Sequence, residues 1–290
     1  MSNYDLIFLT THQNDDHINK LIDSIDTNII NTKILIIIVS QEFDIELNTN
    51  NELLCIAVIK TLKMSLSKAR NIALDYLWQN SISSEYIMFP DDDSSFDQIF
   101  FKNFSTILNS NKNYITPIYK EGTKELYFGK KTKENRIIAP DDHQLIGSPN
   151  QIILYDSLKS EIKFDEKLGV GAKFGSSEDF DLFLKLHQKA NKFLFTNQLY
   201  SYHPAKVAAY KNVKLADIVN RFENYSSGFA YVIFKYKLFS LIPEYLFRTF
   251  AAFIIFGLKF DFKLSMAYFV QFFIRIKLLF YFLFNKASYE

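Results

Sequence analysis

Three consecutive carboxylates, Asp91, Asp92 and Asp93, directly follow a short apolar run and a proline. The run at residues 85–89 consists mostly of strand-forming residues and is bounded by turn signals, so it predicts a buried strand ending at Pro90. Open α/β sheets bind ligands at the carboxyl ends of their strands. Adjacent carboxylates repel one another unless a cation lies among them, and oxygen ligands suit Mg²⁺ or Mn²⁺ completed by substrate phosphates. The tripeptide alone leaves an acidic, solvated turn as the alternative.

Lys68 and Arg70 form a second candidate, because both lie near the start of a predicted helix at residues 65–78 that Ser65 or Ser67 can cap. A cation there opposes the helix dipole, so the placement favours a nearby anion such as a phosphate. Ordinary surface cations on an amphipathic helix are the alternative.

Glu178 and Asp179 stand at the start of another predicted helix, at residues 176–186, where Ser176 and Asp179 could form a capping box. One of the two carboxylates could act as general base on an acceptor hydroxyl, although acids in a first turn often only complement the helix dipole. Among the histidines we single out His203, which precedes a proline and is therefore extended. The other four are interpreted as simple polar surface residues: His12, His17, His143 and His187.

These residues need a scaffold, and the chain predicts an α/β fold. Predicted strands cover residues 4–9, 34–39, 53–59, 85–89, 114–119, 126–128, 151–155, 193–195 and 200–204. Predicted helices cover 17–25, 65–78, 96–108, 176–186 and 211–227. The continuous aliphatic run at 34–39 is typical of a strand buried on both faces of a parallel sheet. The polar stretch at 130–142 is expected to be a loop over the site.

Composition limits the partners and the compartment. The chain has 290 residues and a net charge of +1, which gives no support to nucleic-acid binding. Its single cysteine, Cys55, lies in an apolar run and is expected to be a structural thiol. The first apolar run is short and lacks a preceding basic region, so we expect no signal peptide and a cytoplasmic protein.

Residues 229–290 differ in composition from the rest, which predicts a division into domains 1–228 and 229–290. This tail holds 15 of the 30 phenylalanines and eight Lys/Arg against three acids, a net charge of +5 that leaves −4 for the remainder. Its longest uncharged runs are ten and eleven residues, whereas a span needs about 20. Aromatic, basic helices of this kind lie in the membrane interface, so we expect residues 231–285 to contact a membrane surface. A shallow hairpin, a buried subdomain and a dimer interface are alternatives.

Several motifs together suggest a family. In order, they are a first strand ending in a polar loop, LSKARN (66–71), FPDDD (89–93), FDEKLGVGA (164–172), GSSEDFDL (175–182) and YHP (202–204). Over residues 1–228 this succession resembles bacterial family-2 glycosyltransferases of the GT-A fold. The resemblance implies a Rossmann-like nucleotide-diphospho-sugar transferase fold, with a mixed sheet flanked by helices and a helical hydrophobic C-terminal extension.

The resemblance also implies a chemistry: a nucleotide-sugar donor, a divalent metal (Mn²⁺ or Mg²⁺) and inversion at the anomeric carbon in one displacement. Asp91 would hold the ribose or the donor sugar, and Asp93 the metal, with His203 completing the metal shell. Asp179 would be the catalytic base, and Glu178 a neighbouring acceptor-binding or orienting group. The remaining residues assigned to the donor or its nucleotide are Thr10, Gln41, Lys68, Arg70 and Asp92.

One departure concerns the nucleotide base. Many relatives end the second strand in an aspartate that reads the base, but here Ser40, Gln41 and Glu42 follow that strand. Gln41 could bond a uracil or thymine edge, which favours a UDP- or dTDP-sugar. The acceptor is expected to be a glycan or lipid-linked hydroxyl in cell-surface polysaccharide or glycolipid synthesis, at the inner face of the cell membrane. The alternatives are a non-catalytic nucleotide- or partner-binding member and a metal-dependent nucleotidyl or phosphoryl transferase.

Overall fold

The computed structural model describes residues 3–12, 15–42, 49, 51–158, 162–204, 210 and 212–289. The chain divides into two compact units. The first comprises Met1–Phe164 and Leu182–Ala205, and the second comprises Asp165–Asp181 and Lys206–Glu290. Helix α5 (Glu178–Gln188) has residues in both.

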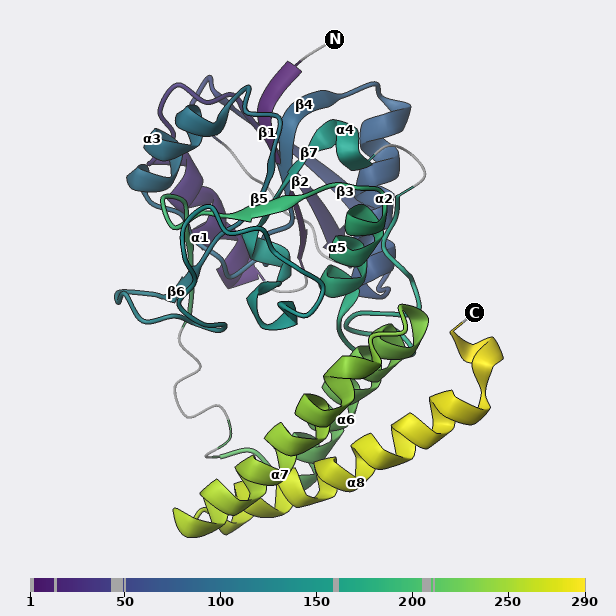
Figure 1. Ribbon diagram of the computed structural model, residues 1–290. Helices are drawn as coiled ribbons and strands as arrows, with labels where there is room; N and C mark the ends of the chain where they lie inside the picture. The colour runs from purple at the N-terminus through teal and green to yellow at the C-terminus, as the bar shows by residue number, and fades with distance from the viewer. Residues whose placement is uncertain are drawn as a thin grey trace. The chain divides into compact units, whose positions relative to one another are not determined.

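A mixed sheet of seven strands forms the centre of the first unit, in the order β3-β2-β1-β4-β7-β5-β8 (Figure 1). The strands are β1 (Asn3–His12), β2 (Ile34–Gln41), β3 (Leu54–Thr61), β4 (Ser83–Met88), β5 (Asn113–Ile115), β7 (Gln151–Leu154) and β8 (Phe193–Phe195). The first four are parallel, β7 is antiparallel to β4 and β5, and β8 is parallel to β5. This confirms the predicted mixed α/β sheet.

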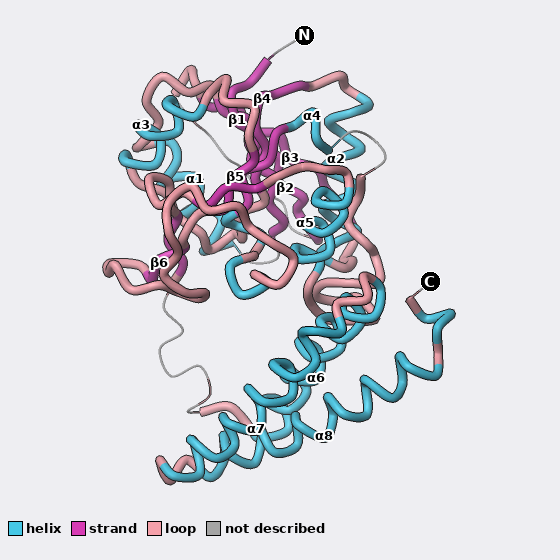
Figure 2. Tube along the Cα trace, viewed as in Figure 1, coloured by secondary structure: helices cyan, strands magenta, loops and turns pink. Residues whose placement is uncertain are grey.

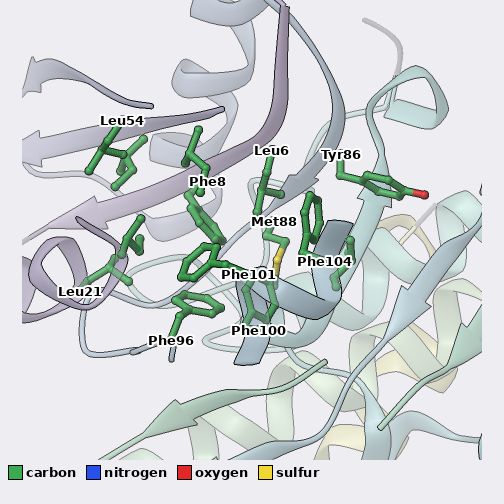
Figure 3. Close-up of a cluster of buried hydrophobic side chains, with 14 of the residues drawn as sticks. Leu6, Phe8, Leu21, Leu54, Tyr86, Met88, Phe96, Phe100, Phe101 and Phe104 are labelled. Carbon is green, nitrogen blue, oxygen red and sulfur yellow. The ribbon is translucent and has the colours of Figure 1, made fainter. Parts of the chain in front are cut away.

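Helices α1 (Asp15–Asp26) and α3 (Gln98–Ile107) cover one face of this sheet. Figure 3 shows the apolar cluster between them, in which Phe8 of β1 and Met88 of β4 lie among aromatic rings. Phe96 is central to it, because its ring lies 4.9 Å from that of Phe8 and 4.7 Å from that of Phe100. Burying these rings fixes the end of β4 at the centre of the sheet.

Helix α2 (Leu66–Gln79) contacts β1 and β2 and buries Ala69, Ala73 and Leu77. The short helix α4 (Tyr155–Leu158) contacts β4 and β7. Because the helices lie on both faces, β2 is buried over its whole length, as its aliphatic run predicted.

The ends of two strands and of two helices differ from the sequence-based predictions. Parallel pairing continues to His12 in β1 and to Gln41 in β2, beyond the predicted ends at 9 and 39, because backbone pairing does not require apolar side chains. Ser65 occupies the N-cap of α2 without a side-chain capping bond. Helix α5 begins at Glu178, so Ser177 rather than Ser176 occupies its N-cap position, and the hydroxyl of Ser176 donates to the carbonyl oxygen of Tyr225 at 3.0 Å.

A second, two-stranded parallel sheet pairs β6 (Ile118–Lys120) with β9 (Ser201–His203). The strand predicted at 126–128 is reduced to an isolated bridge between Leu126 and Tyr119. The small sheet matters for the site, because β9 carries His203.

The second unit is built on three long helices, drawn in cyan in Figure 2: α6 (Leu215–Lys235), α7 (Ile242–Leu258) and α8 (Phe262–Phe284). Helix α8 packs on both others. Polar groups link all three, because Gln271 of α8 donates to the hydroxyl of Ser226 (3.0 Å) and Tyr245 of α7 donates to the carbonyl oxygen of Ser226 (2.9 Å). The domain boundary predicted at 228/229 falls inside α6.

Residues 165–181 pack closely on α6. A Cβ atom on Gly228 would lie 2.2 Å from the carbonyl oxygen of Ser176, so only glycine allows this approach. Lys235 bridges two carboxylates, lying 2.6 Å from Asp165 and 2.6 Å from Asp181. Helix α6 therefore holds the segment that leads into α5.

Candidate functional site

The three aspartates lie in a turn directly after β4, as predicted. Their turn is closed by a hydrogen bond from the backbone N–H of Ser94 to the carbonyl oxygen of Asp91 (3.0 Å). Phe89, between β4 and the turn, is buried with its ring edge-on to Phe164 at 4.9 Å. Because β1, β2 and β4 are parallel, the turn stands at the same edge of the sheet as the carboxyl ends of β1 and β2.

A long-range backbone pairing brings His203 to this turn. Ser95 and Tyr202 exchange two backbone hydrogen bonds, of 3.0 and 2.8 Å. The next residue, His203, then lies with its Nε2 atom 3.0 Å from Oδ1 of Asp93. One ligand atom from each of Asp91, Asp93 and His203 lies within 4.8 Å of the others. The structure therefore brings together the two predicted metal ligands, Asp93 and His203, and adds Asp91.

The charges in this cluster are strongly coupled. Burial, the largest single effect, acts to raise the pKa of Asp93, but the hydrogen bond and charge of His203 and the charge of His17 together outweigh it, so the pKa is lowered. Burial conversely acts to lower the pKa of His203, and the bond to Asp93 raises it. Asp92 behaves differently, because burial, followed by the charge of Asp93, raises its pKa. These two pKa shifts together stabilise an ion pair between a deprotonated Asp93 and a protonated His203.

The residues fit a divalent cation. Two carboxylates and one imidazole form a mixed oxygen and nitrogen donor set of the kind that Mn²⁺ accepts, and oxygen-rich sites also take Mg²⁺. In this fit a proton shared by Asp93 and His203 would be replaced by the ion, since a ligating histidine must be neutral.

Two neighbours of the cluster were missed by sequence analysis. His12 was interpreted as a surface residue, which is wrong: it is fully buried at the end of β1, with Nδ1 3.7 Å from Oδ2 of Asp92. Tyr127 stacks on the imidazole of His203 with ring centroids 4.2 Å apart. Neither had a sequence signal, because His12 stood in a presumed loop and Tyr127 in a stretch without motifs.

Arg70 was predicted near the nucleotide, and the structure places it against Asp91. Only 2% of its side chain is exposed, its guanidinium lies 5.3 Å from the ring centre of Phe164, and it is 3.5 Å from Oδ1 of Asp91. The next residue, Asn71, exchanges two hydrogen bonds with the backbone of Phe164 (2.9 and 3.1 Å). Asn71 thus fixes the ring against which Arg70 lies. Lys68, by contrast, is exposed on α2.

Gln41 and Thr10 bring two buried polar groups to the ends of β2 and β1. Gln41 is 1% exposed, and its Oε1 accepts the backbone N–H of Met64 at 2.8 Å. This bond fixes the orientation of the amide, because only the oxygen can accept. Within the part of the chain that the structure describes, neither Nε2 of Gln41 nor the hydroxyl of Thr10 has a hydrogen-bond partner. Buried polar groups normally have one, so both are candidates for ligand contacts.

Glu178 and Asp179 belong to the second unit, at the start of α5. Glu178 is buried, and Asp179 is half-buried with Oδ1 accepting the backbone N–H of Phe180 at 2.7 Å. Their assignment to catalysis stays a prediction.

Comparison with known proteins rests on structure alone, since no family model and no curated sequence matches the chain. The crystal structure of S. aureus TarS 1–349 superposes with a TM-score of 0.53 at 14% identity, covering 99% of this chain and 92% of that one. The structure of GalNAc-T7 with UDP, GalNAc and Mn²⁺ gives 0.50 at 12% identity, covering 73% and 45%. Both are glycosyltransferases. At these identities the likeness concerns the fold, and it confirms the GT-A architecture predicted from the motifs.

Proposed function

We propose that this protein is an inverting glycosyltransferase that moves a sugar from a nucleotide-sugar donor to a hydroxyl of a glycan or lipid-linked acceptor. The observation that carries the proposal is the cluster of Asp91, Asp93 and His203 at the carboxyl edge of a GT-A sheet. GalNAc-T7, which shares the fold, has UDP, GalNAc and Mn²⁺ bound in its structure. The chain's own donor set suits the same classes of ligand.

In the proposed mechanism Asp93 and His203 hold the divalent ion, and Asp91 binds a hydroxyl of the ribose or donor sugar. When bound, the ion neutralises charge that develops on the departing diphosphate. Arg70 lies 3.5 Å from Asp91, so it restrains that carboxylate and adds positive charge beside the leaving group. Asp92, whose pKa is raised, and Lys68 are proposed as further donor contacts.

Gln41 is proposed to read the base. With Oε1 engaged by Met64, the amide offers only its N–H₂ group, which can donate to a carbonyl oxygen. Uracil and thymine present such an oxygen at the position where cytosine carries an amino group. The proposal therefore favours a UDP- or dTDP-sugar, with Thr10 as a neighbouring donor contact.

Asp179 is proposed as the base that deprotonates the acceptor hydroxyl, with Glu178 binding or orienting the acceptor. The variant Asp179→Asn should lose transfer while it retains metal-dependent nucleotide binding, because the amide cannot take the proton. Transfer at the wild-type rate by this variant would remove Asp179 as the base.

The acceptor is proposed to be presented at the inner face of the cell membrane, with residues 231–285 at the lipid surface. Phe239–Leu258 and Phe262–Phe284, of 20 and 23 residues, are long and apolar enough to cross a membrane by length and composition. The sequence prediction compared only the uncharged runs of ten and eleven residues with the length of a span. The helices continue through the charged residues that bound these runs, so their length does not exclude spanning.

Thermal unfolding of the purified protein with a panel of nucleotides, with and without Mn²⁺, tests the proposal. Binding to the folded state raises the melting temperature by mass action. We expect a rise with UDP or dTDP that needs the metal. If no nucleotide raises the melting temperature, the result would favour a non-catalytic protein. A separate analysis of the reaction products distinguishes the enzyme classes, because release of pyrophosphate instead of a nucleoside diphosphate would favour a nucleotidyl transferase.

A further inference from the structure

An apolar groove of about 430 Å³ lies in the second unit, where α8 meets α6 and α7. Its lining comes from all three helices and includes Phe234 of α6, Ile242 and Leu246 of α7, and Leu279 and Leu283 of α8. The volume lies in the range of ligand sites, about 300–1,000 Å³.

The lining excludes most ligand classes. Every residue around the groove is Phe, Ile or Leu, so no side chain there can bond a sugar, a nucleotide or a peptide backbone. The groove is also open along one side, and Phe239 and Leu283 at its rim are 50% and 54% exposed. A hydrocarbon chain is the ligand that such a surface accepts without leaving polar groups unpaired.

The surroundings indicate a lipid as the source of that chain. In both helices that could cross a membrane, only 17% of the most apolar window is buried. Two polar side chains of this unit, Gln271 and Ser226, bond each other in its interior. Two of the residues that line the groove, Phe280 (57%) and Leu283 (54%), are themselves exposed, as at a contact with lipid.

Two exposed lysines lie near one end of the groove. Lys237 is exposed two residues before Phe239, and Lys286 is exposed three residues after Leu283. The two lysines lie at the same end of the helices, because the ring of Tyr289 returns to within 5.7 Å of Phe234 and 6.1 Å of Phe282. Two cations beside an apolar groove complement an amphiphile with an anionic head group.

We propose that this groove binds one hydrocarbon chain of an anionic membrane phospholipid, whose phosphate lies at Lys237 and Lys286. The lipid would complete the packing between α8 and its neighbours. The proposal goes beyond membrane association in general, because it assigns a single site with a stoichiometry of one. It does not depend on glycosyl transfer.

The test uses the full chain in dodecyl maltoside with added palmitoyl-oleoyl phosphatidylglycerol, and native mass spectrometry to count bound lipids. We expect one lipid per chain that survives dilution in detergent. Leu246→Trp fills the groove and should lower its apparent affinity at least tenfold. Ile254→Trp lies on the same helix, is not among the groove residues and should bind lipid as the wild type does.

The head group is tested by comparing phosphatidylglycerol with phosphatidylcholine. The wild type should prefer the anionic lipid, and Lys237→Gln with Lys286→Gln should abolish the preference, whereas Lys277→Gln on α8 should not. Retention of lipid by Leu246→Trp at the wild-type level, equal loss in Ile254→Trp, or no bound lipid in the wild type would each overturn the site. Circular dichroism of each variant checks that its helices are retained.

Discussion

Metal binding by Asp93 and His203, the predicted ligand pair, depends on their protonation state. The two side chains lie 3.0 Å apart, and each shifts the pKa of the other toward the charged form. A divalent ion held by both residues would take the place of the proton on His203, because a ligating histidine must be neutral. The stacked ring of Tyr127 further limits how the imidazole can turn.

Asp93→Asn should weaken metal-dependent nucleotide binding, because it removes a charged ligand and leaves His203 without its anionic partner. Losing even an outer-shell partner of a metal site costs about 10–100-fold in affinity, so a loss of at least about tenfold is expected here. Calorimetric titration of Mn²⁺ and nucleotide measures it. Asp141→Asn, at an exposed aspartate, is the control and should bind normally. An unchanged Mn²⁺ affinity in Asp93→Asn would reassign the ligand.

Gln41→Glu should change the base preference, because it replaces the free N–H₂ group with an oxygen that accepts. A uracil carbonyl would then face a carboxylate, whereas the amino group of cytosine could donate to it. We expect the ratio of UDP to CDP affinity to fall at least about tenfold, since leaving a buried polar group unpaired costs about 1–3 kcal/mol. Gln41→Met, which removes the amide without adding charge, should weaken UDP binding and leave little preference. If both variants keep the wild-type ratio, Gln41 does not read the base.

The elements around these residues differ in how far the sequence predicts them. The strand before Asp91 and the helix around Arg70 were predictable, because local apolar periodicity and turn residues specify both. The contact of His203 with Asp93 depends on the pairing of Ser95 with Tyr202, which no local pattern encodes. His12 was misread because its strand continues by backbone pairing after the apolar residues end. Sequence therefore located the candidate ligands, and tertiary pairing determined which of them meet.

Helix α6 shows the same limit at the level of elements. The composition break near residue 229 suggested a separable tail, but Tyr231 and Lys235 both bond Asp165 of the FDEKLGVGA motif, at 2.8 and 2.6 Å. Tyr236, just past the helix, bonds Asp181 at 2.9 Å. Deleting residues 231–290 would remove these contacts as well as the apolar helices, so it could not test membrane binding alone.

Lys235→Met should destabilise the second unit at neutral pH, because Asp181 is fully buried and would lose its cation. Removing one partner of a buried ion pair costs about 3–5 kcal/mol. Burial, the largest single effect, acts to raise the pKa of Asp165, but the bond and charge of Lys235, with the bonds from the backbone of Lys167 and from Tyr231, together hold the pKa below its usual 3.8. A lowered carboxyl pKa gives stability that is present above pH 3.8 and is lost as the pH falls through the folded-state value.

The difference in stability between wild type and Lys235→Met should therefore shrink as the pH falls below 3.8. Urea unfolding at a series of pH values measures it. Lys237→Met, at an exposed lysine near the end of the same helix, should change stability little at any pH. A constant difference between wild type and Lys235→Met down to strongly acidic pH would show that the lysine contributes by packing and not by charge.

At the scale of the whole molecule, the proposed membrane contact can be tested without disturbing α6. The connection between α7 and α8 exposes three large apolar side chains within five residues: Leu258 (75%), Phe260 (80%) and Phe262 (69%). Changing all three to serine should weaken binding to vesicles of phosphatidylglycerol and phosphatidylcholine. If even one of them enters the hydrocarbon, its loss costs about 1.5–3 kcal/mol, which is at least roughly tenfold in partitioning.

Co-sedimentation with vesicles measures this partitioning, and the metal-dependent thermal shift with nucleotide should be unchanged in the same variant. Leu62→Ser with Ile137→Ser provides the control, because both residues are exposed apolar side chains of the first unit. Vesicle binding should then depend on where an apolar side chain lies in the chain, and not only on its exposure. Equal loss in both variants would indicate non-specific adsorption, and undiminished binding of the triple variant would place the lipid contact elsewhere on the protein.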